Sequence, residues 1–234
     1  MNNYKVVILA AGTGSRIGDF SKTFNKVLLP IQGKPTICHI IEKFSKDIEI
    51  VIAVGYKKET IIDYLKTAYK NRKITFLDIG KFEGEGTGPG YSLLQCKDEL
   101  QCPFIQFAGD TLVKELIPEP DKNWIGVSKL NNMGRFCSVK IQDGKVIRID
   151  DKVKNNNEYA FIGLFGTKDY EIFWETLENK KELISGEIQV SNGLQALLNK
   201  DFFVKDFTWF DTGTPESYEH AIINYPHGAG YHGK

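Results

Sequence analysis

Short apolar runs alternate with longer amphipathic stretches in the first half of the chain. The runs are rich in β-branched residues and predict buried strands, at Tyr4–Ala11, Ile48–Val54, Ile74–Leu77 and Phe104–Phe107. Apolar positions recur every three or four residues between them and predict helices, at Thr36–Ser45, Glu59–Tyr69 and Tyr91–Leu100. This order is typical of a parallel sheet with helices on both faces, which binds ligands at the carboxyl ends of its strands.

The second half, after Pro118 and Pro120, changes to more closely spaced strands. Asp143-Gly144 is a hairpin turn signal between two of them. Extended segments are predicted at Trp124–Ser128, Arg135–Gln142, Lys145–Ile149, Tyr159–Gly166 and Phe202–Asp206. Helices are predicted at Lys168–Leu183, Glu187–Asn199 and Pro215–Asn224. The predicted fold is therefore α/β: a doubly wound, Rossmann-like, mixed but mainly parallel sheet with helices on both faces and a small β-rich insertion.

Composition narrows the class of protein. The chain has 234 residues, of which 41% are hydrophobic and 26% charged, as in soluble globular proteins. We expect one domain over residues 1–225 and a loose tail over 226–234. No apolar run approaches the roughly 20 residues of a membrane-spanning helix, and no targeting segment precedes the first strand, so we expect a cytoplasmic protein without a membrane partner. The 30 basic and 30 acidic residues give no overall field for nucleic acid.

A glycine-rich turn follows the first predicted strand, over Leu9–Arg16, and Lys26 comes ten residues later. Small residues let the backbone approach phosphates, and successive N–H groups form an anion-binding nest. Arg16 and Lys26 add positive charge there. Taken alone, the turn also fits a tight connection between two elements. A dinucleotide fingerprint needs G-x-G-x-x-G, but Ile17 breaks that spacing, and no G-K-[ST] triplet of a P-loop is present.

Two aspartates follow predicted strands or aromatic segments. Asp110 ends the run Phe104–Asp110, and Asp211 lies between Trp209-Phe210 and the helix that begins near Pro215. A turn or a helix N-cap accounts for either aspartate taken singly. Carboxylates at such positions can also hold the cations that offset phosphate charge. Together the two residues are the candidate metal ligands.

These motifs resemble one family in order and spacing. The run Leu9–Arg16, the segment Lys26–Pro30 and Gly33–Pro35 are similar to the signature of sugar-phosphate nucleotidyltransferases and their phosphocholine and phosphoglutamine-type cytidylyltransferase relatives of surface-polysaccharide pathways. The resemblance implies that Arg16 and Lys26 grip a nucleoside triphosphate. It also implies that Asp110 and Asp211 jointly hold Mg²⁺.

The resemblance extends to the substrate-binding segments. Its nucleotide-binding residues match Leu9, Ala10, Ala11, Gly12, Thr13, Gly14, Gly86, Thr87, Gly88 and Ser92. The segment Gly88–Leu93 is closer to the cytidylyltransferase form, so we expect CTP. The acceptor-binding residues match Lys152, which contacts the acceptor phosphate during catalysis, with Tyr159 and Glu187. Lys154 is the alternative to Lys152. A simpler role for Glu187 is to favour a helix dipole from the first helical turn.

The resemblance leaves the acceptor open. Val153 replaces the family's proline after the acceptor lysine, and Gln189–Asn192 replaces an acidic and threonine pattern. Phosphocholine, a phosphoglutamine-like metabolite and a sugar phosphate are the candidate acceptors. We expect residues 1–118 to bind the NTP and 119–225 the acceptor. The alternatives are a hexose- or heptose-1-phosphate thymidylyl-, uridylyl- or guanylyltransferase, and a non-catalytic subunit that senses nucleotides. The sequence does not specify an oligomeric state.

Overall fold

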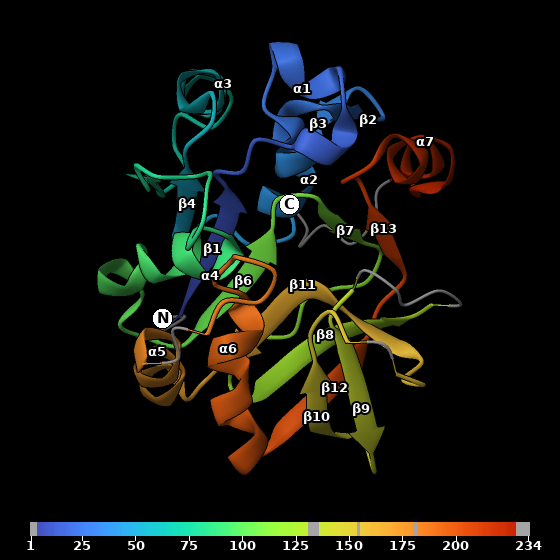
Figure 1. The fold of residues 1–234 in the computed structure, drawn as a ribbon. Coiled ribbons are helices and arrows are strands. Elements are labelled where there is room, and N and C mark those ends of the chain that lie inside the picture. Colours follow the sequence, from blue (N-terminus) through green and yellow to red (C-terminus); the bar gives the residue numbers. More distant parts are fainter. Residues whose placement is uncertain (1–3, 131–135, 154, 180–181, 228–234) are drawn as a thin grey trace.

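A computed structural model describes residues 4–130, 136–153, 155–179 and 182–227 of the chain. The central feature is a nine-stranded sheet with the order β5-β4-β1-β6-β11-β8-β12-β10-β9 (Figure 1). Its strands are β1 (Lys5–Ala10), β4 (Ile50–Val54), β5 (Ile74–Asp78), β6 (Phe104–Ala108), β8 (Asn123–Lys129), β9 (Ser138–Gln142), β10 (Lys145–Asp150), β11 (Tyr159–Thr167) and β12 (Phe202–Asp206). The doubly wound, mixed α/β fold is confirmed.

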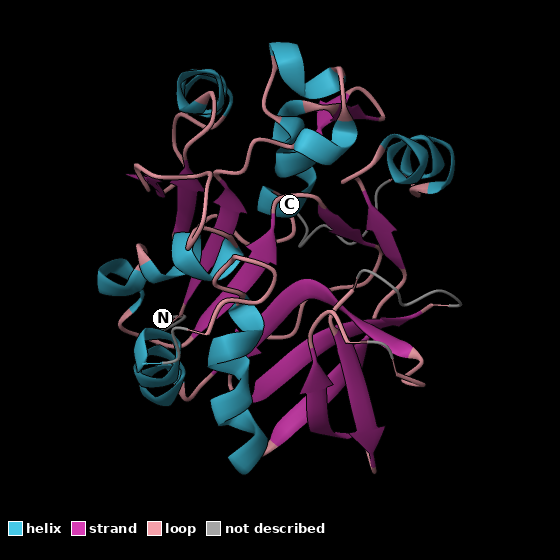
Figure 2. Cartoon of the chain, in the orientation of Figure 1, coloured by secondary structure: helices cyan, strands magenta, loops and turns pink. Residues whose placement is uncertain are grey.

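Helices cover the sheet (Figure 2). The α-helices are α1 (Phe20–Thr23), α2 (Thr36–Ile41), α3 (Lys58–Ala68), α4 (Pro89–Leu94), α5 (Tyr170–Asn179), α6 (Val190–Leu194) and α7 (Pro215–Asn224). The 3-10 turns are η1 (Ser15–Ile17), η2 (Lys26–Leu28), η3 (Lys97–Leu100) and η4 (Gln195–Asn199). Short two-stranded ladders join β2 (Pro30–Ile31) to β3 (Lys34–Pro35), and β7 (Thr111–Val113) to β13 (Trp209–Asp211).

Alternation along the strands produces two apolar cores, one on each face of the sheet. In β1, Val6 and Ile8 belong to one core, whereas Val7 belongs to the other, because successive side chains of a strand point to opposite faces. The first core also contains side chains of α2, α3 and α7, and the second contains side chains of α4, α5 and α6. Both faces are therefore covered by helices, as the sequence predicts.

The strand order reverses beside β1. β4 pairs with β1 in parallel on one side, and β6 pairs with it in parallel on the other. Ligands of open α/β sheets bind at such a switch point, beyond the carboxyl ends of the strands. The glycine-rich turn after β1 and Asp110 after β6 both lie at this edge. Parallel pairing dominates the first half, whereas β11 pairs with β6 and β8 in antiparallel fashion.

The boundaries of several predicted elements need correction. Pro215–Asn224 is a helix as predicted, and β9 and β10 form the expected hairpin at Asp143-Gly144. The helix predicted to begin at Glu187 begins at Val190 instead, so Glu187 is not in its first turn. The helix predicted to reach Leu183 ends at Asn179 among the described residues. Arg135, Lys154 and most of the predicted tail lie outside the described residues.

None of the helices in the described part of the chain is both long and apolar enough to cross a membrane.

Candidate active site

The glycine-rich turn leaves β1 directly at the carboxyl edge of the sheet. Ala10 and Ala11 are each 2% exposed, and the chain then emerges at Gly12, which is exposed. No atom lies within 4 Å of the position that a Cβ would take on Gly12. Gly14 has a positive φ of 69°, and a Cβ on it would lie 3.4 Å from the side-chain stem of Lys26. The turn therefore has an open backbone on one side and the lysine on the other.

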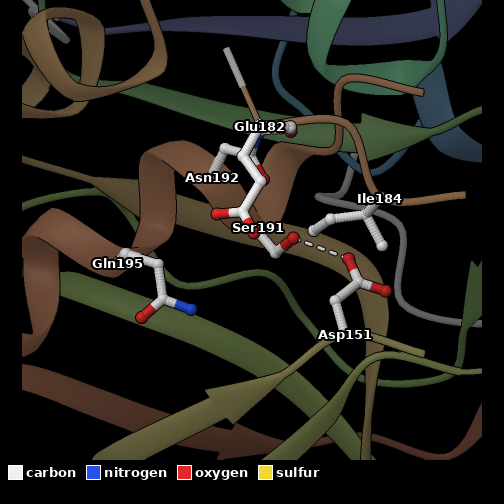
Figure 3. A pocket seen from close by; sticks show the side chains of 6 residues that line it. All are labelled: Asp151, Glu182, Ile184, Ser191, Asn192 and Gln195. Carbon is white, nitrogen blue, oxygen red and sulfur yellow. Dashed lines mark hydrogen bonds between the residues drawn. The ribbon is translucent and has the colours of Figure 1, made fainter. Parts of the chain in front are cut away.

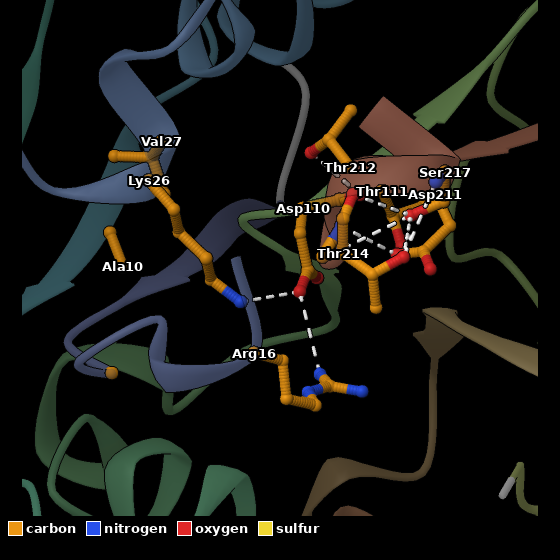
Figure 4. A network of polar contacts seen from close by, with 12 residues as sticks. Ala10, Arg16, Lys26, Val27, Asp110, Thr111, Asp211, Thr212, Thr214 and Ser217 are labelled. Carbon is orange, nitrogen blue, oxygen red and sulfur yellow. Dashed lines mark hydrogen bonds and ion pairs between the residues drawn. The ribbon is translucent and has the colours of Figure 1, made fainter. Parts of the chain in front are cut away.

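Lys26 and Arg16 both approach Asp110 (Figure 4). The ammonium group of Lys26 donates to Asp110 Oδ2, and the side chains of the two residues are 16% and 15% exposed. The Arg16 guanidinium lies 4.0 Å from the same oxygen, and its side chain is 59% exposed. Burial raises the pKa of Asp110, but the positive charges of Lys26 and Arg16 outweigh this effect and hold the pKa below its usual range. Asp110 is therefore an anion between two cations.

The short β7–β13 ladder brings Asp211 to the same place. In this ladder Asp211 pairs with Thr111, the residue after Asp110. Thr212 N and Thr212 Oγ1 both donate to the carbonyl oxygen of Asp110, at 2.9 and 3.1 Å. Two aspartates that are 101 positions apart in the sequence thus lie side by side at the end of the sheet.

Gly213 shows how closely the two carboxylates converge. A Cβ on this residue would lie 3.0 Å from Asp211 Oδ1 and 3.1 Å from Asp110 Oδ2, with the Arg16 guanidinium at 3.6 Å. The backbone N–H of Gly213 donates to Asp211 Oδ1 at 2.9 Å. The space beside Gly213 is therefore bounded by two carboxylate oxygens, one from the turn between β6 and β7 and one from the end of β13.

This pair of carboxylates fits a magnesium ion that is also bound by substrate phosphates. Mg²⁺ in phosphate-transfer sites is commonly held by one or two carboxylates together with substrate phosphates. Asp110 and Asp211 offer oxygen ligands on a common space, and oxygen is the ligand type that Mg²⁺ prefers. Among the described residues, no group of three or more His, Cys, Asp or Glu side chains is placed to hold a metal. Phosphate oxygens would complete such a site.

The segment predicted to bind the nucleobase packs on the segment predicted to bind the acceptor. Gly86 N donates to Gly186 O at 2.9 Å, and Ile188 N donates to Thr87 O at 2.8 Å. Gly88 lies so close that a Cβ on it would be 2.8 Å from the Cβ of Glu187. The two segments are therefore one continuous piece of structure, held by backbone hydrogen bonds.

The hydroxyl groups of Thr87 and Ser92 donate hydrogen bonds within the segment that is predicted to bind the nucleobase. Thr87 Oγ1 donates to Gly84 O at 2.6 Å, and Ser92 Oγ donates to Gly88 O at 3.1 Å. Both residues are buried, with 4% and 8% exposure. Their contacts with a nucleotide stay a prediction.

Two of the predicted acceptor residues meet in the structure. Lys152 Nζ lies 3.5 Å from Glu187 Oε2, and Glu187 also accepts a hydrogen bond from Gln189 Nε2 at 2.7 Å. Lys152 has a positive φ of 56°, a strained backbone conformation that is common at functional positions. Tyr159, in contrast, packs partly buried against the second core. Its role at the acceptor stays a prediction.

A pocket of about 200 Å³ lies beside Asp151, the residue before Lys152 (Figure 3). Its lining is mostly polar: Asp151, Glu182, Ile184, Ser191, Asn192 and Gln195. Ser191 Oγ donates to Asp151 Oδ2 at 2.6 Å, and this bond ties the start of α6 to the residue before Lys152. The pocket is thus lined by the residue next in sequence to the candidate acceptor lysine.

Sequence reasoning did not identify Thr212 and Gly213 as parts of the site. Thr212 fixes the main chain of Asp110, and Gly213 leaves room between the two carboxylates. A signal was present, since both residues lie in the segment Asp211–Pro215 that marks the second aspartate. Their specific roles depend on Asp110, which is remote in sequence.

Solved structures share this fold. The structure of CTP:phosphocholine cytidylyltransferase from Streptococcus pneumoniae matches with a TM-score of 0.76 and 21% identity, over 96% of this chain and 100% of that one. A UDP-glucose pyrophosphorylase complexed with UDP-glucose superposes with a TM-score of 0.76 and 20% identity, over 96% of this chain and 98% of that one. This chain therefore has the same α/β fold as these two enzymes.

The nucleotidyl transferase family model matches residues 5–227, and the chain belongs to this family. It is 32% identical over 221 residues to the bifunctional protein GlmU of Methanococcus vannielii, which covers 89% of this chain and 52% of that protein. It is 26% identical over 228 residues to the D-glycero-alpha-D-manno-heptose 1-phosphate guanylyltransferase of Campylobacter jejuni, and the match covers 94% of this chain and 99% of that protein. The chain spans about half the length of the GlmU relatives.

Proposed function

We propose that this chain is a magnesium-dependent nucleotidyltransferase that joins a nucleoside monophosphate from an NTP to a phosphorylated small molecule and releases pyrophosphate. The observation that carries the proposal is the convergence of Arg16, Lys26, Asp110 and Asp211 at the switch point of the sheet. Family membership supports the same reaction. A sensor of nucleotides has no need of two carboxylates that converge on one space.

The reaction is a direct displacement at the α-phosphorus. An oxygen of the acceptor phosphate forms the new P–O bond, the bond between the α-phosphorus and the bridging oxygen to the β-phosphorus breaks, and pyrophosphate leaves with that electron pair. Lys26 and Arg16 offset the negative charge that accumulates on the phosphates. Asp110 and Asp211 would hold magnesium, which would supply Lewis-acid stabilisation of the same charge. No covalent enzyme intermediate is required.

The acceptor binds on the side of Lys152 and Glu187 in this proposal. The ammonium group of Lys152 neutralises the incoming phosphate, and Glu187, held by Gln189, is displaced from its ion pair or bonds to the rest of the acceptor. The polar pocket beside Asp151 has room for hydroxyl or amide groups. We propose a sugar phosphate as the acceptor class, and phosphocholine or a phosphoglutamine-like metabolite as the alternatives.

We propose CTP as the donor, because Gly88–Leu93 is similar to the cytidylyltransferase form. One relative carries the name of a guanylyltransferase, which makes GTP the principal competitor. On this proposal residues 1–118 contribute most nucleotide contacts and 119–225 the acceptor contacts, apart from Asp211. The product is a precursor for surface-polysaccharide synthesis.

The test is a matrix of donors and acceptors. Purified protein with Mg²⁺ is incubated with CTP, UTP, GTP, ATP or dTTP and with sugar 1-phosphates, phosphocholine or phosphoglutamine, and released pyrophosphate is measured. The proposal expects release that requires both substrates and a coupled product detectable by mass spectrometry. NTP binding without turnover in any combination contradicts it and favours the sensor. Turnover with GTP but not CTP contradicts the donor assignment alone.

A further inference from the structure

Asn25 directly precedes Lys26 and is completely buried, with 0% exposure. Its Oδ1 accepts a hydrogen bond from Val27 N at 3.1 Å and caps the turn η2, which begins at Lys26. A side-chain cap of this kind satisfies a backbone donor and fixes the way in which the turn begins. The backbone at Lys26 is therefore oriented by the side chain before it.

The amide nitrogen of Asn25 connects three other segments. Asn25 Nδ2 donates to the carbonyl oxygen of Ala10 at the end of β1, at 3.1 Å, and to that of Tyr56 after β4, at 2.8 Å. A longer contact of 3.4 Å reaches the carbonyl oxygen of Gly12 in the glycine-rich turn. One buried side chain thus joins the ends of two neighbouring parallel strands to the phosphate-binding turn.

Other contacts close the same unit. Tyr56 N donates to Ala11 O at 2.9 Å, and Tyr56 Oη donates to Ser21 O at 3.2 Å. The ammonium group of Lys57 donates to the carbonyl oxygen of Lys22. The Lys57 bond is exposed and the Tyr56 hydroxyl bond is partly buried, whereas the Asn25 side chain is fully buried. Loss of the Asn25 amide removes this donor from the buried carbonyl group of Ala10 and the partly buried one of Tyr56, and a buried group left unpaired costs more than its hydrogen bond contributes.

We propose that Asn25 is a positioning residue that holds the Lys26 ammonium in register with Asp110 and the triphosphate. This inference rests on the proposed function, in which Lys26 balances phosphate charge. Asn25 acts only through its neighbours, because a fully buried side chain does not reach a substrate. Its four contacts fix both the turn that carries Lys26 and the backbone at Gly12.

A double-mutant cycle tests the proposal. Pyrophosphate release is measured for the wild type, Asn25→Ala, Lys26→Ala and the double variant. A misplacement of about 1 Å in an active site costs about 100-fold in rate, so Asn25→Ala is expected to lower kcat by about 10- to 100-fold. In the Lys26→Ala background the same change is expected to cost less than about threefold, because coupled residues are not additive. Equal losses in both backgrounds overturn the proposal.

A second variant separates the cap from the cross-link. Asn25→Ser keeps an oxygen that accepts from Val27 N but removes the amide that binds Ala10 and Tyr56. We expect its kcat to fall nearly as far as that of Asn25→Ala, with a smaller loss of stability. Wild-type kcat in Asn25→Ser overturns the proposal, and this variant serves as the test if Asn25→Ala does not fold.

Asn123 provides the matched control. It is also a buried asparagine, 4% exposed, and its amide donates to Asp169 Oδ2 at 2.7 Å while its Oδ1 accepts from Lys168 N at 3.0 Å. It begins β8, which runs in the same direction as β6, so it lies at the edge of the sheet opposite Asp110. Asn123→Ala is expected to lower the Tm but to keep kcat within about twofold, since distant sites act independently. A loss of kcat equal to that of Asn25→Ala contradicts a positioning role.

The two proposals fail in different ways. A wild-type protein that releases no pyrophosphate with any donor and acceptor contradicts the proposed function. An active wild type in which Lys26→Ala is impaired but Asn25→Ala is not contradicts this inference alone.

Discussion

Asp110 was predicted from its place at the end of an apolar run, and Lys26 from its place just before the apolar segment Val27–Leu29 and from the family resemblance. A residue that follows a buried parallel strand must lie at the carboxyl edge of the sheet, so strand ends give the neighbourhood of the site directly. Asn25 and Gly213 were not predicted as parts of it. The role of Asn25 depends on carbonyl groups of Ala10 and Tyr56, and these become neighbours only in the folded chain.

The variant Gly12→Ala is expected to change NTP binding without changing the stability of the fold. The new methyl group meets no atom within 4 Å and the residue has no positive φ, so the free energy of unfolding should change by no more than about 0.5 kcal/mol. In the proposed function, the methyl group occupies the space through which phosphates approach the backbone. The KM for the NTP should rise about tenfold or more, because the variant loses a hydrogen bond to a charged group and such a bond contributes about that factor to binding. Steady-state kinetics and urea unfolding measure both, and an unchanged KM contradicts phosphate binding at Gly12.

Lys43 gives the protein a specific pH dependence. It is 1% exposed, and its ammonium donates to Lys114 O at 3.1 Å and Glu115 O at 3.0 Å, beyond the end of β7. Burial lowers the pKa of Lys43 to about 8, partly offset by the charge of Glu115. Because the unfolded chain binds this proton more tightly, stability rises as pH increases above about 8 and is lost as pH falls through that value.

The comparison with Lys43→Met isolates this residue. Between pH 7 and 9.5 the wild type should gain about 2 kcal/mol in free energy of unfolding relative to the variant. Urea unfolding at the two pH values measures the difference. The same pH dependence in both proteins contradicts a lowered pKa for Lys43.

At the scale of elements, long-range backbone pairing explains what sequence patterns missed. Ile188 uses its N–H and C=O on Thr87 and Gly90, so the backbone before Val190 is extended and the helix begins later than its pattern indicates. β7 and β13 have three residues each, too few for a periodic signal, and they pair across nearly 100 positions. In contrast, α7 has both a proline at its first turn and a capping box, and its bounds were predictable.

Gly88→Ala tests the contact between the base and acceptor segments. Its methyl group would be 2.8 Å from Glu187 Cβ, with φ at 115°, and should displace Glu187 from Lys152. Gly86→Ala is the control, because its φ of 79° is also positive but its methyl group meets no atom within 4 Å. Both variants should lose about 1–3 kcal/mol of stability from backbone strain. Only Gly88→Ala should raise the KM for the acceptor, by about tenfold, because only this variant disturbs a charged contact at the acceptor site. An equal KM for the acceptor in the two variants contradicts coupling between the base and acceptor segments.

At the scale of the whole molecule, the alternation of strands and helices determined the fold class correctly. Apolar strands require cover on both faces, and the doubly wound arrangement meets that requirement. Asp211 shows where sequence order is a poor guide, because the chain returns after β12 to place it beside Asp110. The candidate site is therefore built from both halves of the chain.

Binding of an NTP should stabilise the whole molecule. A ligand present at 100 times its Kd adds about 2.7 kcal/mol to the free energy of unfolding. We expect CTP with Mg²⁺ to raise the Tm by several degrees, and to do so less when EDTA removes the metal. Asp110→Asn should lose the metal-dependent part of the shift. An identical shift with Mg²⁺ and with EDTA contradicts a metal bridge between Asp110 and the phosphates.

The most direct measurement is kcat for pyrophosphate release in Lys26→Ala and Asp110→Asn, with the donor and acceptor that the wild type uses. Removal of one electrostatic stabiliser of a transition state costs about 100-fold or more, and we predict such a loss in each variant. Lys145→Ala and Asp201→Asn are matched controls, because these residues form an exposed ion pair of 2.6 Å between β10 and the start of β12, and they should keep the wild-type rate. Full turnover in Lys26→Ala or Asp110→Asn would contradict the proposed active site.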